Sequence, residues 1–343
     1  MWYKRPYNFF IYSSLMIIVT GGAGFIGSNI VAALEKAGKK DLVVVDELGS
    51  SDKWKNIAKR ELCAVIPPED MLDYMEAHAE EIEAVIHMGA ISATTETDAD
   101  LIIRTNFTLS WRLWEFCALY GKQFIYASSA ATYGDGSMGF DDDSSLEHVN
   151  ALRPLNAYGW SKALFDRKVA REVKEGRPVP PQYAGLKFFN VYGPNEYHKG
   201  GQKSVVAHIF PQVKVNETVK LFKSYHPDYR DGWQLRDFVW VGDCVNVVLW
   251  LLDHPEVSGL FNVGSGEARS FYDLAKAAFN ALGLQEKIAY REMPEELKGK
   301  YQYYPQADLS RLRAAGYAAP MTSLEDGVRQ YVQKYLDRED SYV

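Results

Sequence analysis

Residues 17–28 read Ile-Ile-Val-Thr-Gly-Gly-Ala-Gly-Phe-Ile-Gly-Ser, an apolar run that leads into glycines at positions 21, 24 and 27. The spacing predicts a strand, a tight turn and the start of a helix. Gly21 would permit the turn, Gly24 would let a phosphate approach the backbone, and Gly27 would let the helix pack close to the strand. The free N–H groups and the positive dipole at a helix N-terminus also favour phosphate. The stretch therefore predicts a dinucleotide-binding loop.

A second apolar run supports this interpretation. Residues 42–46 read Leu-Val-Val-Val-Asp, so an acidic residue ends the next predicted strand. An acidic residue about 20 positions after such a loop commonly holds the ribose hydroxyls of the dinucleotide. A glycine loop that holds no ligand is the less favoured alternative.

Composition and charge narrow the class of protein. The chain of 343 residues is long enough for one large α/β domain and a smaller one. Its hydrophobic residues at 47% and charged residues at 24% are ordinary for a globular protein. The net charge of -7, without Lys/Arg blocks, argues against nucleic acid as a partner, and no apolar run is long enough to span a bilayer. Cys63, Cys117 and Cys244 have neither metal-ligand nor disulfide spacing, so we expect small core residues and no metal site.

The first residues superficially resemble a signal peptide, with Lys4 and Arg5 followed by an apolar stretch. No small-residue cleavage site follows, and the stretch merges into the strand that the glycine loop requires. We therefore expect residues 1–15 to be a dispensable extension or to follow from an upstream start, so that a protein beginning at Met16 folds.

Apolar runs alternate with helical patterns up to about residue 190, which predicts an α/β fold with a Rossmann-type doubly wound parallel sheet. The predicted strands are 17–20, 42–46, 84–88, 123–128 and 184–189, and the predicted helices are 27–37, 101–120 and 158–174. Further on, we expect strands at 237–241 and 260–263, and helices at 243–252, 270–282 and 324–335. The predicted division is a Rossmann domain at 16–190 with 237–264 returning to it, a smaller, mixed C-terminal substrate-binding lobe at 191–236 and 265–336, and a tail at 337–343.

The segment Tyr158-Gly-Trp-Ser-Lys162 places a tyrosine and a lysine four residues apart, on one face of a predicted helix. A phenol has a pKa of about 10, and a nearby ammonium lowers this value, so that the phenolate can form and act as a base near neutral pH. A positively charged nicotinamide would add to this effect. Ser129, at the end of the strand predicted at 123–128, would orient the hydroxyl group that is oxidised. We predict Ser129, Tyr158 and Lys162 as a catalytic triad, in which Lys162 also holds the nicotinamide ribose.

On these residues the chain resembles the extended short-chain dehydrogenase/reductase superfamily, and within it the family of ADP-L-glycero-D-manno-heptose 6-epimerases. Beyond the glycine loop and the triad, the motifs that carry the resemblance are His87–Glu96, Asn106, Ala127–Tyr133, Asn190–Pro194, His198–Gly200, Leu235–Asp243, Leu297–Gln302, Gln306–Leu309 and Leu312–Tyr317. They extend over nearly the whole chain, from about Met16 to the last predicted helix.

The resemblance implies an epimerase that oxidises the heptose of ADP-D-glycero-β-D-manno-heptose at C6'' to a ketone. The same nicotinamide then reduces the ketone on its opposite face, for the synthesis of lipopolysaccharide core heptose. Two opposite geometries call for two bases, and the family pattern places them at Tyr158 and Lys199. Lys199 would need a lowered pKa to accept a proton.

The resemblance and the loop pattern together imply a cofactor site. Its residues are Gly21, Gly24, Phe25, Ile26, Gly27, Asp46, Glu47, Lys53, Met88, Gly89, Ala90, Ile91, Ser92, Asn106, Lys162 and Val191. Asp46 and Glu47 favour NAD because carboxylates repel a 2′-phosphate, whereas Lys53 matches a family lysine associated with NADP. A second such lysine is replaced near Pro68. We predict NADP as the cofactor, with NAD tolerated.

The resemblance also implies a substrate site, formed by Ser129, Asn190, Gly201, His208, Phe222, Lys223, Ser224, Arg236 and Tyr301. Arg236 is the expected partner of the pyrophosphate. A core position is the alternative for His208. The chain departs from the family pattern at Gly201, where the family has a serine, and at residues 224–235, which form a longer loop.

Other functions remain open at this point. A dehydratase or reductase acting on another nucleotide sugar would keep the fold, but a dehydratase usually carries acidic residues where this chain has Ala130, Ala131, Ala157 and Gly159. A non-catalytic dinucleotide sensor is disfavoured by the intact triad. The resemblance further implies a cytoplasmic homo-oligomer, a pentamer in the family.

Overall fold

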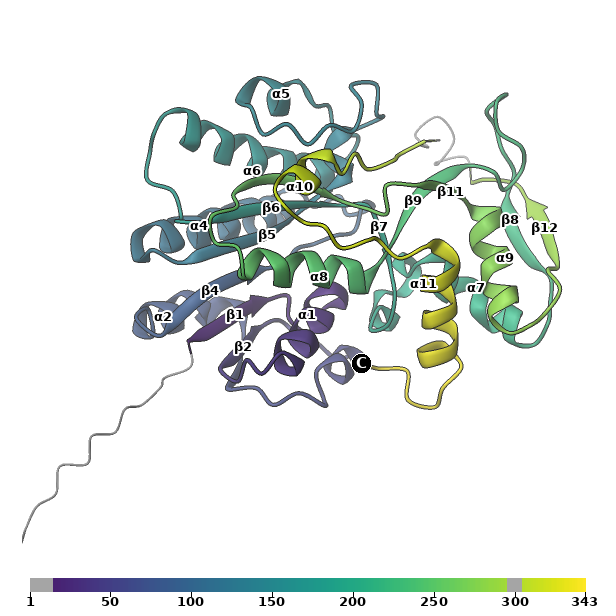
Figure 1. Cartoon of the computed structure of the whole chain (residues 1–343), viewed down its shortest axis with the longest axis horizontal. Helices are drawn as coiled ribbons and strands as arrows, with labels where there is room; N and C mark the ends of the chain where they lie inside the picture. Colours follow the sequence, from purple (N-terminus) through teal and green to yellow (C-terminus); the bar gives the residue numbers. More distant parts are fainter. Residues whose placement is uncertain (1–14, 295–303) are drawn as a thin grey trace, which may run out of the picture.

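A computed structural model describes residues 15–294 and 304–343 (Figure 1). The expectations for the N-terminal extension, for Tyr301 and for the motif at 297–302 lie outside the described residues, apart from Leu15.

Seven parallel strands form a large sheet in the spatial order β10-β6-β5-β4-β1-β2-β3. The strands are β1 (Met16–Thr20), β2 (Leu42–Val45), β3 (Ala64–Ile66), β4 (Ile82–His87), β5 (Gln123–Ser129), β6 (Tyr183–Phe188) and β10 (Gly259–Val263). This order is that of a doubly wound Rossmann sheet, so the predicted fold class is confirmed. The sequence analysis missed β3, because three residues are too short to show a period.

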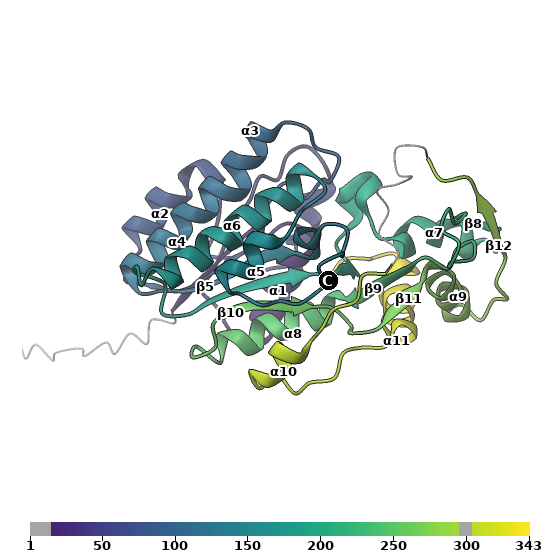
Figure 2. The ribbon, with the colours of Figure 1, turned by 90° about the horizontal axis from the view of Figure 1, so that it is seen from above.

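Helices cover both faces of the large sheet, as Figure 2 shows. One face carries α1 (Phe25–Lys36), α8 (Val241–Leu252) and α10 (Ser310–Ala314), and the other carries α2 (Met71–Ala77), α3 (Ala99–Ile102), α4 (Leu109–Tyr120) and α6 (Ala157–Lys174), with α5 (Leu146–Ala151) against α6. The helix predicted at 101–120 is interrupted, since a π-helical turn, η3 (Ile103–Thr108), separates α3 from α4.

Successive residues of the central strands point to opposite faces of the sheet. Ile17 and Val19 pack with α1 and α8, whereas Ile18 and Val43 pack with α2, α4 and α6. Both faces are therefore apolar, which explains why the strands read as continuous hydrophobic runs.

A smaller mixed lobe follows the large sheet. It contains a three-stranded sheet of β7 (Asn190–Tyr192), β9 (Leu235–Trp240) and β11 (Ala268–Ser270), a pair of β8 (Val219–Phe222) and β12 (Ile288–Arg291), and the helices α7 (Val205–Lys214), α9 (Phe271–Ala281) and α11 (Leu324–Tyr331). The predicted return of residues 237–264 to the large sheet applies to α8 and β10. Strand β9 pairs instead with β7 and β11. Its pattern would be the same in either sheet, so the sequence could not distinguish these partners.

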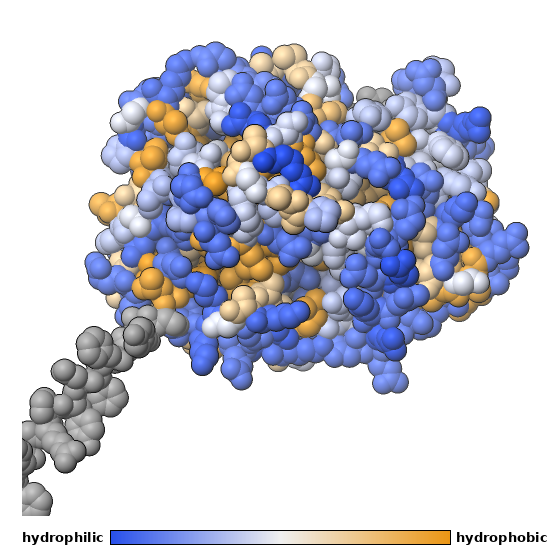
Figure 3. All heavy atoms as spheres, in the orientation of Figure 1, coloured by the Kyte–Doolittle hydropathy of each residue, from blue (hydrophilic) through white to orange (hydrophobic). Residues whose placement is uncertain are grey.

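Two expectations about the surface can be compared with the structure. Cys117 and Cys244 are buried, but Cys63 is exposed, so its predicted core position is wrong. On the face shown in Figure 3, small hydrophobic groups are interspersed with hydrophilic residues. Among the described residues, no helix is long and apolar enough to cross a membrane.

Candidate active site

The glycine loop connects β1 to α1 at the carboxyl edge of the large sheet. Gly21 has φ +65°, and a Cβ there would lie 2.5 Å from the backbone N of Gly89. A Cβ on Gly27 would lie 2.1 Å from the carbonyl oxygen of Gly21. Both positions therefore require glycine, Gly21 for its turn and its contact with the end of β4, and Gly27 for close packing of α1.

The start of α1 is suited to an anion. Gly24 is the N-cap residue and, having no side chain, makes no capping bond to the first N–H groups of the helix. Such groups need an external acceptor, and the helix dipole favours a negative one. The described residues around this loop therefore fit the diphosphate of a dinucleotide.

Asp46 follows β2 and bonds directly to the glycine loop. One of its carboxylate oxygens accepts the N–H of Ala23 at 2.9 Å, and the other accepts Nζ of Lys53 at 2.5 Å. Lys53 also donates to the carbonyl of Glu47 at 2.9 Å. The ammonium of Lys53 thus lies against the carboxylate whose charge favours NAD over NADP.

Asn106 holds the loop that follows β4. It is fully buried on the π-helical turn, its Oδ1 accepts the N–H of Ile91 at 2.9 Å, and its Nδ2 donates to the carbonyl of Ile91 at 2.9 Å. The same amide group donates to Ser161 Oγ at 3.1 Å, on α6. Asn106 therefore fixes the loop of Met88, Gly89, Ala90, Ile91 and Ser92 against the helix that carries Tyr158 and Lys162.

The predicted triad comes together where β5 ends and α6 begins. Ser129 is the last residue of β5, and its side chain lies close enough to the phenol of Tyr158 to affect its pKa. A Cβ on Gly159 would lie 2.7 Å from the carbonyl oxygen of Ala131, so α6 begins in close contact with the turn after β5. Lys162, one turn further along α6, is buried and donates from Nζ to the carbonyl of Ala127 at 2.8 Å.

Burial sets the proton affinities in the triad. It raises the pKa of the Tyr158 phenol, and the hydrogen bond from Ser129 opposes this effect. Burial also lowers the pKa of the Lys162 ammonium to about 8, against the pull of the Asp166 carboxylate. Tyr158 is therefore protonated near neutral pH in the free protein, and it needs a further positive charge nearby to act as a base.

Lys199 lies beside the glycine loop, although the two are far apart in sequence. It is on a 3₁₀ turn, η5 (Tyr197–Gln202), with Nζ 5.5 Å from the ring centroid of Phe25, the first residue of α1. Burial lowers the pKa of Lys199, while the carboxylate of Glu196 raises it. This environment suits a lysine that accepts a proton.

The sequence analysis missed two residues that hold this turn. Asn195, at φ +72°, donates from Nδ2 to Ser28 Oγ at 2.9 Å, and its carbonyl accepts Nδ2 of Asn56 at 3.0 Å. Glu196 is buried and accepts the hydroxyl groups of Ser204 at 2.6 Å and Tyr331 at 3.0 Å. An asparagine directly after Gly193-Pro194 was the available signal, since asparagine tolerates positive φ.

The predicted substrate residues lie on several elements. Asn190 on β7 is the register partner of Phe238 on β9, two residues after Arg236, so Asn190 and Arg236 share one face of the small sheet. Val191 follows Asn190 on β7.

The other predicted substrate residues make contacts within the protein. Phe222, at the end of β8, stacks against the guanidinium of Arg291 at 4.7 Å, and Lys223 pairs with Glu292 at 2.6 Å. Ser224 accepts a bond from the N–H of His226 at 3.2 Å. His208 is exposed and bonds to the carbonyl of Gly201 at 3.1 Å, so the alternative of a core histidine is wrong.

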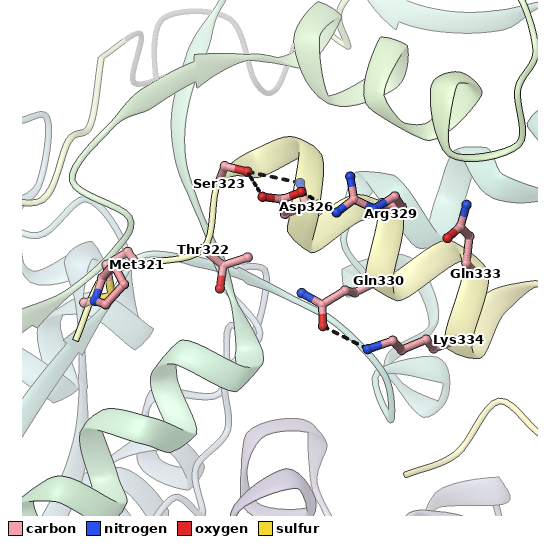
Figure 4. A pocket seen from close by; sticks show the side chains of 9 residues that line it. Met321, Thr322, Ser323, Asp326, Arg329, Gln330, Gln333 and Lys334 are labelled. Carbon is pink, nitrogen blue, oxygen red and sulfur yellow. Dashed lines mark hydrogen bonds and ion pairs between the residues drawn. The ribbon is translucent and has the colours of Figure 1, made fainter.

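Two cavities lie among residues outside the predicted site. One of about 640 Å³ is lined by residues 320–323 and by α11, including Arg329, which pairs with Asp326 (Figure 4). The other, of about 820 Å³, lies between residues 140–141, 265–266 and 304–313. Neither cavity includes a predicted site residue. Among the described residues there is no cluster of side chains that could hold a metal ion.

A buried ion pair stabilises the turn that carries Ser129 of the triad. Lys187 on β6 and Asp166 on α6 are both 1% exposed, with 2.9 Å between Nζ and Oδ2. Asp166 also accepts the hydroxyl of Ser128 at 2.7 Å, and Lys187 donates to Thr132 Oγ1 at 2.7 Å. The pair thus holds both sides of the turn that presents Ser129.

Lys187→Met should lower the free energy of unfolding by about 3–5 kcal/mol, because it leaves the Asp166 carboxylate buried without its cation. Urea unfolding followed by circular dichroism measures this loss. The matched control is Lys39→Met, which removes a part-exposed pair with Glu83 and should cost about 0–1 kcal/mol. If Lys187→Met were as stable as this control, the pair would have no structural role.

The fold and the glycine loop place this protein in the class of Rossmann-type α/β proteins. The profile of the NAD dependent epimerase/dehydratase family matches residues 17–264, and the chain belongs to this family.

Individual relatives agree with this assignment. The chain is 50% identical over 336 residues, 96% of its length, to the whole of the ADP-L-glycero-D-manno-heptose-6-epimerase of Fusobacterium nucleatum. Its structure is similar to that of the Helicobacter pylori ADP-L-glycero-D-manno-heptose-6-epimerase, with a TM-score of 0.75, 27% identity, and coverage of 94% of this chain and 96% of that one. It is also similar to the Thermus thermophilus UDP-glucose 4-epimerase in complex with NAD, with a TM-score of 0.69, 25% identity, and coverage of 93% and 98%.

Proposed function

We propose that this chain is an isomerase that converts ADP-D-glycero-β-D-manno-heptose into its L-glycero epimer at C6'', a step in making the heptose of lipopolysaccharide. The 50% identity with a whole relative of that name carries the proposal. The position of Ser129 at the end of β5 and of Tyr158 at the start of α6 supports it, because the carboxyl edge is where open α/β sheets bind their ligands.

A nicotinamide dinucleotide is the cofactor of the proposed reaction. Bound at the glycine loop, it would remove hydride from the sugar carbon and return it to the opposite face. The N-terminus of α1 would hold its diphosphate, Asp46 would bind a ribose hydroxyl, and Lys162 would bind the nicotinamide ribose.

Two side chains of this protein would move the proton. Tyr158, with Ser129 beside it, would take it from the sugar hydroxyl in one geometry, and Lys199 would serve the opposite geometry. The buried ammonium of Lys162 would favour the phenolate of Tyr158, and the lowered pKa of Lys199 would make its neutral form accessible. In the substrate site, Arg236 and Asn190 would hold the pyrophosphate from the small sheet.

Proton NMR of the purified protein with ADP-D-glycero-β-D-manno-heptose, without added cofactor, tests the proposal. We expect resonances of the L-glycero epimer and no net accumulation of reduced cofactor, because the cofactor is regenerated in each turnover. A protein that carries its nicotinamide and leaves the spectrum unchanged would contradict the proposal. A deoxygenated product would assign the protein to the dehydratases instead.

NADP is the proposed form of the cofactor, with NAD tolerated. Lys53 supports this choice, since its ammonium lies against Asp46 and offsets the repulsion of a 2′-phosphate. Lys53→Met should weaken NADP binding by roughly 10- to 100-fold, the loss expected for a hydrogen bond between charged groups, and should leave NAD binding within about twofold. Titration calorimetry on cofactor-free protein measures both affinities.

Lys55→Met is the matched control, because Lys53 and Lys55 lie on one 3₁₀ turn, η1 (Asp52–Asn56), where Lys55 pairs with the exposed Asp52 at 3.1 Å. It should change neither affinity. An equal loss for both cofactors in Lys53→Met would show that Lys53 only supports the loop.

The proposal also includes a cytoplasmic location and assembly as a homo-oligomer, pentameric by resemblance to the family. Light scattering of the purified protein measures the assembly.

A further inference from the structure

The last four residues of the chain, Asp340-Ser-Tyr-Val343, lie against the turn that carries Lys199. The carbonyl of Ser341 accepts the hydroxyl of Tyr197 at 2.8 Å, and the backbone N–H of Val343 donates to Asn195 Oδ1 at 3.1 Å. The rings of Tyr342 and Tyr197 meet edge to face, with 5.3 Å between their centroids. Three contacts thus join this segment to two residues just before Lys199.

The same segment also contacts Lys59, in the stretch that follows η1, the turn of Lys53. Lys59, just beyond that 3₁₀ turn, donates from Nζ to the carbonyl of Tyr342 at 2.8 Å and pairs with the Asp340 carboxylate at 2.6 Å. This ion pair is exposed on both sides and adds little by itself. The aromatic contact and the backbone hydrogen bonds are the stronger part of the attachment.

Contacts from other segments hold the turn η5 and the preceding Asn195 in position. Asn195 has a positive φ, and Gly200 has φ 54° and ψ -123°, which interrupts the 3₁₀ turn. Backbone in such regions persists where surrounding contacts hold it, and here Glu196 also accepts hydroxyl groups of Ser204 and Tyr331. Asn56 and Ser28 hold Asn195 from one side, and the chain's last residues hold Asn195 and Tyr197 from the other.

We propose that residues 340–343, which we name the C-terminal strap, act as a positioning segment that fixes Lys199 beside the glycine loop. The part that concerns catalysis rests on the proposed function, because it takes Lys199 as one of two bases. The strap contacts Lys199 through Asn195 and Tyr197. A small displacement of a reacting group is enough to lower a rate by a large factor.

Hydrogen exchange of the whole protein, read by mass spectrometry, tests the structural part. Tyr342→Ala should speed exchange of amides in residues 195–202 by roughly 3- to 10-fold, in line with the loss of one aromatic contact. Removing residues 340–343 should speed it by roughly 10-fold or more, because the backbone bonds are lost as well. Peptides from β1, β4 and α6 should exchange as in the unchanged protein.

Tyr342→Phe is the matched control, since it keeps the ring, and Ser341→Ala is a second one, since Ser341 contributes only its carbonyl to Tyr197. Both should exchange like the unchanged protein. Unchanged exchange of residues 195–202 after removal of the strap would overturn the proposal, as would an equal increase over the whole chain.

Single-turnover kinetics with each epimer test the link to Lys199. Tyr342→Ala should slow the same half-reaction as Lys199→Met, by roughly 10-fold or more in rate, and spare the half-reaction that depends on Tyr158. Equal slowing of both half-reactions, or loss of substrate affinity alone, would overturn the positioning role. If the unchanged protein turned over neither epimer, the proposed function would fail, while the exchange experiment would still decide whether the strap holds the turn.

Discussion

Tyr158→Phe should lower the turnover number for epimerisation by roughly 10²–10⁴-fold, the range expected when a general acid-base group is lost. The ring that packs at the start of α6 is kept, and only the hydroxyl that contacts Ser129 is removed. Cofactor binding should therefore change by less than about twofold, since Lys162 and the glycine loop are intact. Proton NMR of the two epimers gives the rate, and fluorescence of the bound cofactor gives its occupancy.

A control for this experiment is Tyr183→Phe, which removes a partly buried hydroxyl on β6, outside the predicted site. It should leave the turnover number within about twofold. A Tyr158→Phe protein as active as this control would remove Tyr158 from the mechanism. A protein that also lost its cofactor would show that Tyr158 acts in binding.

Lys199→Met should also lower the turnover number for epimerisation by roughly 10²–10⁴-fold. Oxidation and reduction occur on opposite faces of the sugar carbon, so the complete reaction needs both bases. Each half-reaction is the oxidation of one epimer by the bound cofactor. Lys199→Met should slow the half-reaction that Tyr158→Phe spares, and spare the one that Tyr158→Phe slows. One epimer should still reduce the bound cofactor in a single turnover, and the other should not. Rapid-mixing absorbance of the nicotinamide with each epimer measures this difference.

Lys199→Arg separates proton transfer from charge. Arginine keeps the positive charge over Phe25 but cannot give up its proton, so it should be as slow as Lys199→Met. The neighbouring change Lys203→Met, just after the same turn, should leave both half-reactions near the unchanged rate. Full activity of Lys199→Arg would leave Lys199 with an electrostatic role alone, and equal slowing of both epimers would contradict the two-base scheme.

The two predictions rest on different kinds of information. Tyr158 and Lys162 could be placed from sequence, because residues four apart on a helix share a face whatever surrounds them. Ser129 could be placed with them, because it ends a strand of a parallel sheet and such ends meet at one edge. The position of Lys199 against Phe25 could not be derived from local pattern, since it depends on how the small lobe packs on the large sheet.

The same distinction explains what the sequence analysis missed. The period of β9 is that of any half-buried strand, so its partners could not be read from it. The Asp166–Lys187 pair was not foreseen, because charged residues in a sequence are usually solvated. The exposure of Cys63 and of His208 could not be predicted either, since it depends on which other segments cover a residue. Cys63 was expected in the core, and a core position was one alternative for His208, but both are exposed.

By itself, the amino-acid sequence determined the sheet type, the glycine loop and the spacing of Tyr158 and Lys162, because backbone geometry and period are local properties. Only the tertiary structure decided that Lys53 neutralises Asp46, that Lys199 reaches the glycine loop and that the last residues hold its turn. The Lys53–Asp46 pair joins residues seven apart across the irregular turn after β2, which no regular period predicts. The other two are contacts between segments distant in the chain, and their partners are set by how the two lobes pack together rather than by any repeat in the sequence.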